Sequence, residues 1–299
     1  MLLRAMAELL SHEQVETGII EEIFDKDETF ALLPFMKITG KAYVYDRELT
    51  ISEADFLDPN DTVNEGTSEF VEVVSKLRIL IGDVDVDKFL DETMSDTHSQ
   101  KAIQLSQKAK GLGRKFKRTL ARGNNSTAPK EFDGIARLVT AGQTIDTAVN
   151  GASLTMNMLD ELADKVPLGA DCFVMRPGTV RAYRALLRAQ SGTDASMVEI
   201  ENFGVPVLGH NGIPIVKNEF LAGDEAMGTT PTTCSVYAAR FNLADGLHGI
   251  YGGESAGVRV EDIGTVQTKD ATRTRLKWYA GLALKSTKSL ARLRGVTNV

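Results

Sequence analysis

Residues 37–86 constrain the fold most, because this segment is long, β-like and too polar to bury itself. Two runs of β-forming residues, 42–45 and 70–74, flank a polar stretch that contains proline, asparagine and glycine. This pattern is typical of an extended hairpin. Residues 46–72 include nine acidic residues and one basic residue. Because isolated two-stranded hairpins are marginally stable in water, we expect this one to lie on another surface.

Charge is divided unevenly along the chain. Residues 1–72 hold seventeen acidic and five basic residues, whereas the remainder holds twenty-four acidic and twenty-nine basic residues. A short amphipathic helix is expected within the acidic part, at residues 11–24. The division favours an acidic segment that lies on a basic body, in the same subunit or in a neighbour. An acidic face in contact with solvent is the alternative.

The composition is that of a globular protein with a substantial core, since 42% of the residues are hydrophobic and 25% are charged. The length of 299 residues allows one large domain or two ordinary ones. No stretch approaches the roughly 20 apolar residues of a membrane helix, and no secretory signal is recognisable, so we expect neither membrane contact nor export. Cys172 and Cys234 stand alone, which fits a reducing compartment.

Residues 88–121 carry the clearest helical pattern. Apolar residues recur there at spacings compatible with 3.6 residues per turn. The stretch 101–122 contains eight basic residues and no acidic one. Such a run is usually a solvated helix face, and contact with phosphates is the sharper hypothesis. The candidates for such a phosphate-contacting face are Lys108, Arg114, Lys115, Lys117 and Arg118.

The rest of the chain predicts an α+β fold. Residues 132–239 alternate helical and strand patterns, with helices at 153–165 and 177–190 and a buried strand at 172–175. From residue 276 to residue 284, alternate positions are apolar and their neighbours are largely polar or basic. This alternation predicts a strand with one buried face and one wet, basic face.

One string matches a catalytic motif letter for letter. Residues 253–257 read Gly-Glu-Ser-Ala-Gly, the pattern that places a nucleophilic serine, here Ser255, on the strand-to-helix turn of α/β-hydrolases. In that fold the acid and the histidine follow the serine, whereas all four histidines of this chain precede it. Residues 258–262 alternate like a strand. We therefore expect a glycine-rich turn between strands and no enzymatic activity.

Asp83, Asp85 and Asp87 have the spacing of the first ligands of an EF-hand calcium loop. The sixth position of that loop is Lys88 instead of glycine, and the twelfth is Met94 instead of glutamate. An alternating strand edge is the better interpretation. No histidine has a second ligand at metal spacing, and no phosphate-binding glycine loop is present. We expect no catalytic, metal or cofactor site.

The order of these elements resembles the major capsid protein of tailed double-stranded-DNA bacteriophages, the Hong Kong 97-type capsid family, over nearly the whole chain. Strings that look like that family are residues 32–35, 132–135, 154–162, 173–179, 203–207 and 212–215. The resemblance implies an α+β capsid fold with an N-terminal arm, an extended β-hairpin loop, a long spine helix in a peripheral domain, and an inserted axial domain. The implied bounds are 1–36 for the arm, 37–86 for the extended loop, 87–131 and 242–299 for the peripheral domain, and 132–241 for the axial domain.

The resemblance also implies a function. Such a chain assembles as hexamers and pentamers into an icosahedral shell around packaged double-stranded DNA, in the virion capsid, after assembly in the host cytoplasm. The arm and the extended loop would lie on neighbouring copies, and the basic helix face would meet DNA, the acidic arm or the acidic loop. An encapsulin-type nanocompartment, which encloses enzymes instead of a genome, is the nearest alternative, and a serine hydrolase that uses Ser255 is a remote one.

Partners and covalent chemistry follow from the same resemblance. Scaffolding, portal and decoration proteins are the candidate partners besides other copies of the chain. Because no long scaffold-like segment precedes the arm, we expect a separate scaffolding protein or a propeptide outside this chain. The type member of the family crosslinks its shell through a lysine of the extended loop. This sequence has no lysine between Lys41 and Lys76, so we expect no such crosslink.

Overall fold

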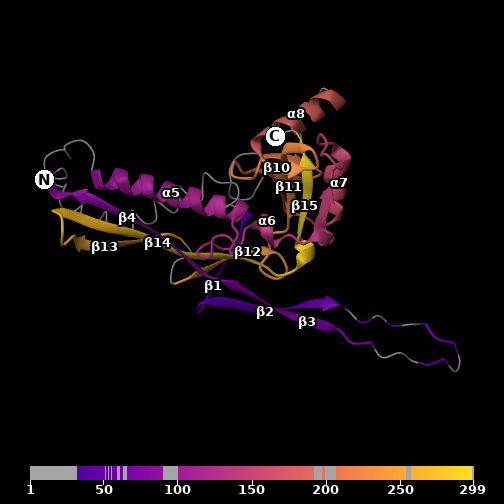
Figure 1. Cartoon of the computed structure of the whole chain (residues 1–299), viewed down its shortest axis with the longest axis horizontal. Helices are drawn as coiled ribbons and strands as arrows, with labels where there is room; N and C mark the ends of the chain where they lie inside the picture. The colour runs from indigo at the N-terminus through magenta and orange to yellow at the C-terminus, as the bar shows by residue number, and fades with distance from the viewer. Residues whose placement is uncertain are drawn as a thin grey trace.

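The computed structural model of the chain describes residues 32–89, 100–191, 197–198, 207–253 and 257–297, apart from residues 51, 53, 55, 59–60 and 63–65. The predicted helix at 11–24, most of the predicted arm and Ser255 lie outside these residues. The described residues form an elongated lobe, a compact α/β lobe and a projecting hairpin (Figure 1). The predicted α+β class is confirmed.

A five-stranded sheet forms the elongated lobe, and its central strand is β14 (Ala271–Leu284). β4 (Arg78–Asp87) pairs antiparallel with β14, and so do β13 (Arg259–Thr265) and β12 (Leu247–Gly252). β1 (Phe35–Ile38) pairs in parallel with β12. The predicted alternation between a buried and a wet face holds from Leu276 to Ala280, whereas Ala280–Leu284 is buried throughout, because Ala283 packs against Ile38 and Ile250. The five alternate apolar residues of the predicted buried face are all buried. They are Leu276, Trp278, Ala280, Leu282 and Leu284.

Helix α5 (Gln100–Arg122) lies along one face of this sheet (Figure 1). Its apolar residues join the larger hydrophobic core, in which the ring centroid of Phe116 lies 4.5 Å from that of Trp278 and 5.3 Å from that of Phe132. The predicted long helix is therefore confirmed over residues 100–121, whereas residues 90–99 lie outside the description. The buried residues of its predicted stripe are Leu105, Ala109, Leu112, Phe116 and Leu120.

The compact lobe is built on a second sheet, which has eight strands in the order β5-β15-β11-β6-β9-β8-β7, with β10 paired to β11. Helices α7 (Met156–Asp164) and α8 (Pro177–Ser191) contribute to its separate hydrophobic core. The strands are β5 (Thr144–Asp146), β6 (Cys172–Met175), β7 (Met197–Val198), β8 (Val207–His210), β9 (Ile213–Lys217), β10 (Glu225–Met227), β11 (Thr230–Ala239) and β15 (Leu290–Val296). Short helical turns are α6 (Ile135–Leu138), Ala141–Gln143 and Thr287–Ser289.

The local predictions for this lobe are confirmed. Helix α7 begins after Thr155, whose hydroxyl accepts a hydrogen bond from the main-chain N–H of Met158 at 3.4 Å, as an N-cap residue does. Strand β6 has the predicted bounds, and all four of its residues are buried.

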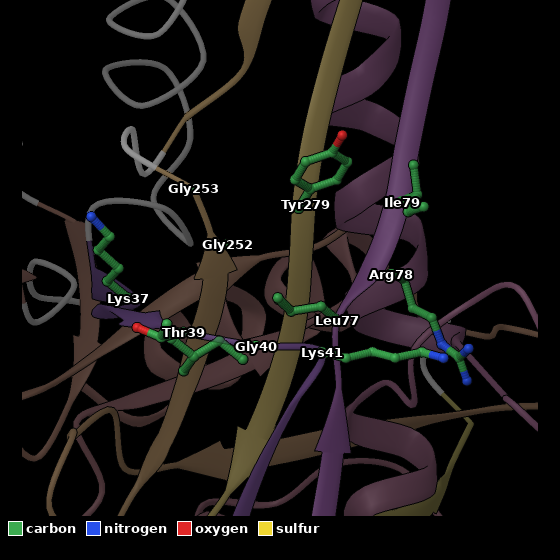
Figure 2. Close-up of a pocket in the computed structure, with 11 residues that line it drawn as sticks. Lys37, Thr39, Gly40, Lys41, Leu77, Arg78, Ile79, Gly252, Gly253 and Tyr279 are labelled. Carbon is green, nitrogen blue, oxygen red and sulfur yellow. The ribbon is translucent and has the colours of Figure 1, made fainter.

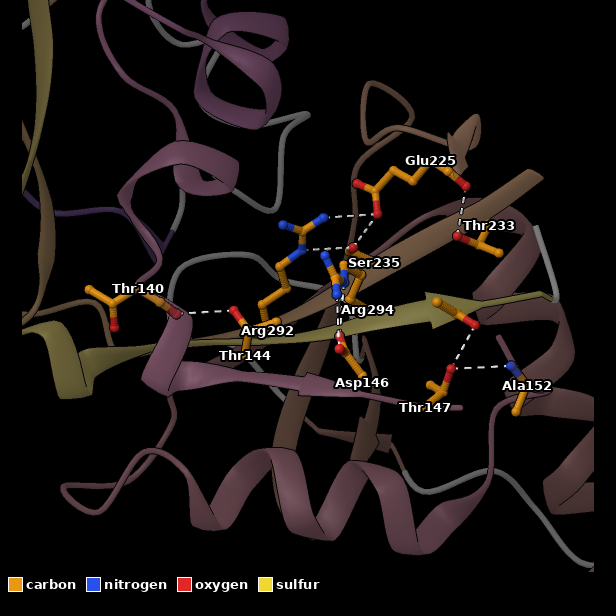
Figure 3. Close-up of polar contacts among 11 residues, drawn as sticks. Thr140, Thr144, Asp146, Thr147, Ala152, Glu225, Thr233, Ser235, Arg292 and Arg294 are labelled. Atoms are coloured by element: carbon orange, nitrogen blue, oxygen red, sulfur yellow. Dashed lines mark hydrogen bonds and ion pairs between the residues drawn. The ribbon is translucent and has the colours of Figure 1, made fainter. Parts of the chain in front are cut away.

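Ion pairs fix the outer strands of the lobe to one another (Figure 3). Arg292 on β15 donates to Ser235 on β11 at 2.9 Å and to Glu225 on β10 at 3.0 Å. Two strand positions further on, the guanidinium of Arg294 donates to both carboxylate oxygens of Asp146 on β5 at 2.8 Å. These side chains connect the four neighbouring strands β5, β15, β11 and β10.

The chain passes between the two sheets three times. It enters the eight-stranded sheet between α5 and β5, returns between β11 and β12, and enters again between β14 and β15. The family resemblance implied that all of residues 242–299 belong to the peripheral domain. In the structure β15 instead pairs with β11 and β5 in the eight-stranded sheet. The buried residues of β15, among them Leu290 and Leu293, fill the cores beneath those partners.

The projecting hairpin consists of β2 (Ala42–Thr50) and β3 (Glu69–Lys76), which pair only with each other (Figure 1). The predicted hairpin is thus present but shorter than residues 37–86. β4 leaves it at Arg78 and joins the five-stranded sheet, because Leu80, Val84 and Val86 pack into the core under α5.

Candidate assembly surfaces

The root of the β2–β3 hairpin is fixed to the body by side chains of β2. The Tyr45 hydroxyl donates to the main-chain oxygen of Leu284 at 2.6 Å, and Arg47 Nε donates to that of Lys285 at 2.7 Å. The Tyr43 ring lies edge-on to His248, with 6.0 Å between ring centroids. These contacts determine the direction in which the hairpin leaves the molecule.

Beyond its root, the hairpin exposes apolar side chains. It carries seven of the fourteen large hydrophobic residues that are exposed among the described residues. Exposed apolar residues gathered on one projecting element mark a candidate interaction site. The sequence argument that the hairpin cannot bury itself is therefore supported. The seven residues are Val44, Leu49, Phe56, Leu57, Phe70, Val71 and Val74.

A groove of about 640 Å³ lies where the hairpin root meets the five-stranded sheet (Figure 2). Its surface is largely apolar, with Ile38, Leu77, Ile79 and Tyr279 among the lining residues. Three cationic side chains rim it: Lys37 at one end, and Lys41 and Arg78 toward the other (Figure 2). No acidic residue is among the described residues that line it.

Sequence reasoning missed this groove. Its lining comes from four segments, 37–41, 77–79, 252–253 and Tyr279, which only the strand pairing brings together. One signal was available, because apolar residues occupy successive positions from Ile79 to Ile81. That run predicts side chains on both faces of a strand, and Ile79 is 69% exposed on the side away from α5.

The sheet face around the groove carries a ladder of cross-strand ion pairs. Asp83 and Asp85 on β4 each accept two hydrogen bonds, from Arg275 and Arg273 on β14, at 2.7–2.8 Å. The hydrogen bonds from Arg275 lower the pKa of the Asp83 carboxyl. The interpretation of these aspartates as an alternating strand edge is confirmed. Within the described part of the chain, no three His, Cys, Asp or Glu side chains are grouped as a metal site requires.

The five candidate basic residues of α5 do not share one environment. The stem of Lys108 covers β4, since a Cβ on Gly82 would lie 2.5 Å from Lys108 Cε. Lys115 pairs with Glu131, and Lys117 is half-buried. The structure therefore spreads the predicted basic face over at least two sides of the helix.

Arg114 and Arg118 lie one helical turn apart and are both exposed. Arg114 lies 3.4 Å from a carboxylate oxygen of Glu219 and 5.7 Å from the ring centroid of Phe220. Arg118 has no ion-pair partner among the described residues. These two side chains are the part of the predicted face that is most available to an external anion.

The catalytic interpretation of residues 253–257 requires a helix after the motif, whereas the next described element is a strand. β12 ends at Gly252 and β13 begins at Arg259, so the string connects two strands, as expected. Ser255 itself lies outside the described residues. Cys172 and Cys234 are both buried and unpaired, and burial raises the pKa of each thiol.

Comparison with known proteins assigns the fold. No family model and no curated protein sequence matches this chain. The structure matches the holo-SrpI encapsulin complex from Synechococcus elongatus, with a TM-score of 0.69, 18% identity, and coverage of 89% of this chain and 85% of that chain. It also matches the capsid of the native GTA particle, with a TM-score of 0.63, 13% identity, and coverage of 90% and 89%.

A chain from a structure of Mycobacterium phage Adephagia matches with a TM-score of 0.62 and 12% identity, over 89% of this chain and 88% of that chain. The chain therefore has the Hong Kong 97-type capsid fold, which is shared by phage capsids and encapsulins. No helix in the described residues is both long and apolar enough to cross a membrane.

Proposed function

We propose that this chain is the major capsid protein of a tailed double-stranded-DNA bacteriophage. In this proposal, copies of the chain assemble as hexamers and pentamers into an icosahedral shell that encloses packaged DNA. The observation that carries it is the β2–β3 hairpin, whose exposed apolar residues have no core of their own. A neighbouring copy supplies that core. The capsid fold supports the same conclusion.

Each part of the chain has a role in this shell. Residues 1–36 form an arm and residues 37–86 an extended loop, and the arm and the β2–β3 hairpin of that loop lie on neighbouring copies, whereas β4 stays in the sheet of its own chain. Residues 132–241 form the axial domain, and residues 87–131 and 242–299 form the peripheral domain, except that β15 completes the eight-stranded sheet of the axial domain. The shell is the virion capsid, it is assembled in the host cytoplasm, and its other partners are scaffolding, portal and decoration proteins. The chain acts as a structural protein and not as an enzyme.

Electron microscopy of the overexpressed chain tests shell formation. We expect closed particles, with co-expressed scaffold where the chain requires one. A chain that remains a rigid monomer at high concentration, with the hairpin packed on its own body, would contradict the proposal. Because the sequence has no lysine between Lys41 and Lys76, denaturing gels of the particles should show single chains, and a ladder of covalent multimers would refute that expectation.

The encapsulin alternative is favoured by one observation, the match to the encapsulin from Synechococcus elongatus. The two functions differ in what the shell encloses. Native particles that absorb at 260 nm like nucleic acid support the capsid, whereas particles whose spectrum is that of protein support the nanocompartment.

We also propose that, of the five candidates Lys108, Arg114, Lys115, Lys117 and Arg118, the exposed pair Arg114 and Arg118 lies near DNA phosphates inside the shell. Replacing Arg114 and Arg118 with glutamate should lower the amount of DNA retained per particle and its resistance to salt. The matched control replaces Arg181 and Arg184, which are exposed on α8, and changes the charge equally. Equal DNA retention in the two variants would show that the α5 pair does not contact DNA.

A further inference from the structure

We infer that the groove at the hairpin root is the receptor for the hairpin tip of a second copy of this chain. This inference rests on the proposed function, because it names the surface on which the extended loop docks. The receptor is the groove of Figure 2, and the ligand is the turn region around Phe56, Leu57 and Asp58.

The apolar surfaces of the tip and the groove are complementary. Phe56 is fully exposed and Leu57 is 44% exposed, although both are side chains that proteins normally bury. The groove offers an apolar floor, in which Ile79 is 69% exposed. Burying two such side chains and the floor beneath them removes apolar surface from water on both partners.

The charges are complementary as well. The hairpin contains nine acidic residues and one basic residue between positions 46 and 72, and Asp58 and Asp61 are exposed at its tip. The groove is rimmed by Lys37, Lys41 and Arg78, and neither lysine has an ion-pair partner among the described residues. Arg78 donates from Nη2 to Asn125 Oδ1 at 2.6 Å. A carboxylate at this rim therefore finds the unpaired ammonium groups of Lys37 and Lys41.

The tip cannot reach the groove of its own chain. Seventeen residues separate Lys41 from Asp58, and at about 3.3 Å per residue an extended strand of that length spans up to about 55 Å. Figure 1 shows the hairpin directed away from the body, with its root and its tip at opposite ends. A hairpin tip that occupies the groove must therefore come from another copy.

A contact between tip and root is heterologous, because the two surfaces belong to different parts of the chain. Heterologous contacts repeat from copy to copy and generate closed rings when the rotation between copies closes. The hexamers and pentamers of the proposed shell are such rings. A tip bound in each groove would thus hold successive copies together in a ring.

Disulfide trapping tests the assignment. Chains with Leu57→Cys and chains with Ile79→Cys are co-assembled and oxidised, and we expect covalent dimers that neither variant forms alone. A chain with both substitutions should give a ladder of multimers. The native Cys172 and Cys234 do not interfere, because both are buried. The matched control replaces Ile79→Cys with Ile263→Cys, which is also an exposed apolar residue of the five-stranded sheet. We expect at least tenfold less crosslinking with that control.

The outcomes separate this inference from the proposed function. Particles that form normally but give no 57–79 dimers, or equal dimers with Ile263→Cys, overturn the receptor assignment and leave the shell intact. Dimers between Ile79→Cys and Leu10→Cys instead would assign the groove to the arm. Failure of the parent chain to assemble at all counts against the proposed function.

A charge exchange provides a second measurement that does not depend on cysteine chemistry. Lys41→Glu should reduce the yield of particles at least tenfold, and Asp58→Lys in the same chain should restore it. If Asp58→Lys fails to restore assembly while both single variants stay folded, the groove does not receive this tip.

Discussion

The aromatic cluster between α5 and the five-stranded sheet supports a quantitative prediction for Phe116→Ala. Phe116 is 1% exposed, and its ring lies 4.5 Å from that of Trp278 and 5.3 Å from that of Phe132. Replacing a buried phenylalanine with alanine costs about 3–5 kcal/mol, and each aromatic pair adds about 0.5–1.5 kcal/mol beyond area burial. Phe35 forms a third pair, with 6.2 Å between ring centroids, and because Phe116→Ala removes all three pairs we expect a loss near the upper end of the range of about 3–5 kcal/mol.

That loss is large relative to the stability of a domain, which is typically about 5–15 kcal/mol. Since about 1.4 kcal/mol corresponds to a factor of ten, a loss of about 4 kcal/mol changes the folding equilibrium about a thousandfold. With a urea dependence of about 3 kcal/mol per molar, at the upper end for small proteins, the unfolding midpoint falls by more than about 1 M.

Urea unfolding of the unassembled chain measures this effect. The chain has one tryptophan, Trp278, which lies against Phe116, so its fluorescence reports on this contact directly. The control is Phe70→Ala on the hairpin, where the side chain is 65% exposed and the expected change is within about 0.5 kcal/mol. If Phe116→Ala shifts the urea midpoint less than Phe70→Ala does, both measured against the parent, the packing argument is refuted.

Three further predictions concern the ion-pair ladder, the hairpin root and the cysteines. Arg275→Gln removes the hydrogen bonds that lower the pKa of Asp83, so the variant is less stable than the parent at neutral pH. A carboxyl whose pKa is lower in the folded state adds stability at pH values above its unfolded pKa of 3.8, and this stability is lost as the pH falls through the folded pKa. The difference in urea midpoint between variant and parent should therefore close as the pH falls below 3.8. Arg47→Ala removes donors to the main-chain oxygens of Leu284 and Lys285, so amide exchange in β2 should accelerate about tenfold while that of β6 stays unchanged. Cys172 and Cys234 are buried with raised pKa values, so iodoacetamide should modify neither in the folded chain and both in urea, as mass spectrometry can show.

The sequence predicted the elements whose pattern is local. The apolar spacing of α5, the helix predicted at 153–165 and found as α7 at 156–164, and the four buried residues of β6 depend on neighbours in the chain. The hairpin was also predictable, because its acidic composition excludes a private core.

The contacts between distant segments could not be predicted in the same way. The basic side chains of α5 are engaged by acids as distant as Glu219 and Asp262, which no local pattern associates with the helix. The return of β15 to the eight-stranded sheet depends on pairing with β5, about 150 positions earlier. The groove at the hairpin root combines four separate segments, so its cationic rim is visible only once the strands are paired.

The three passages of the chain between the two sheets restrict where a subunit can deform. Two lobes joined at three points resist bending about any single linker, so we expect them to move as one plate. Within the described residues, the side-chain hydrogen bonds that tie the hairpin to that plate lie at its root. A curved shell requires neighbouring copies to meet at slightly different tilts, and this geometry places that adjustment in the hairpin, between plates that keep their shape.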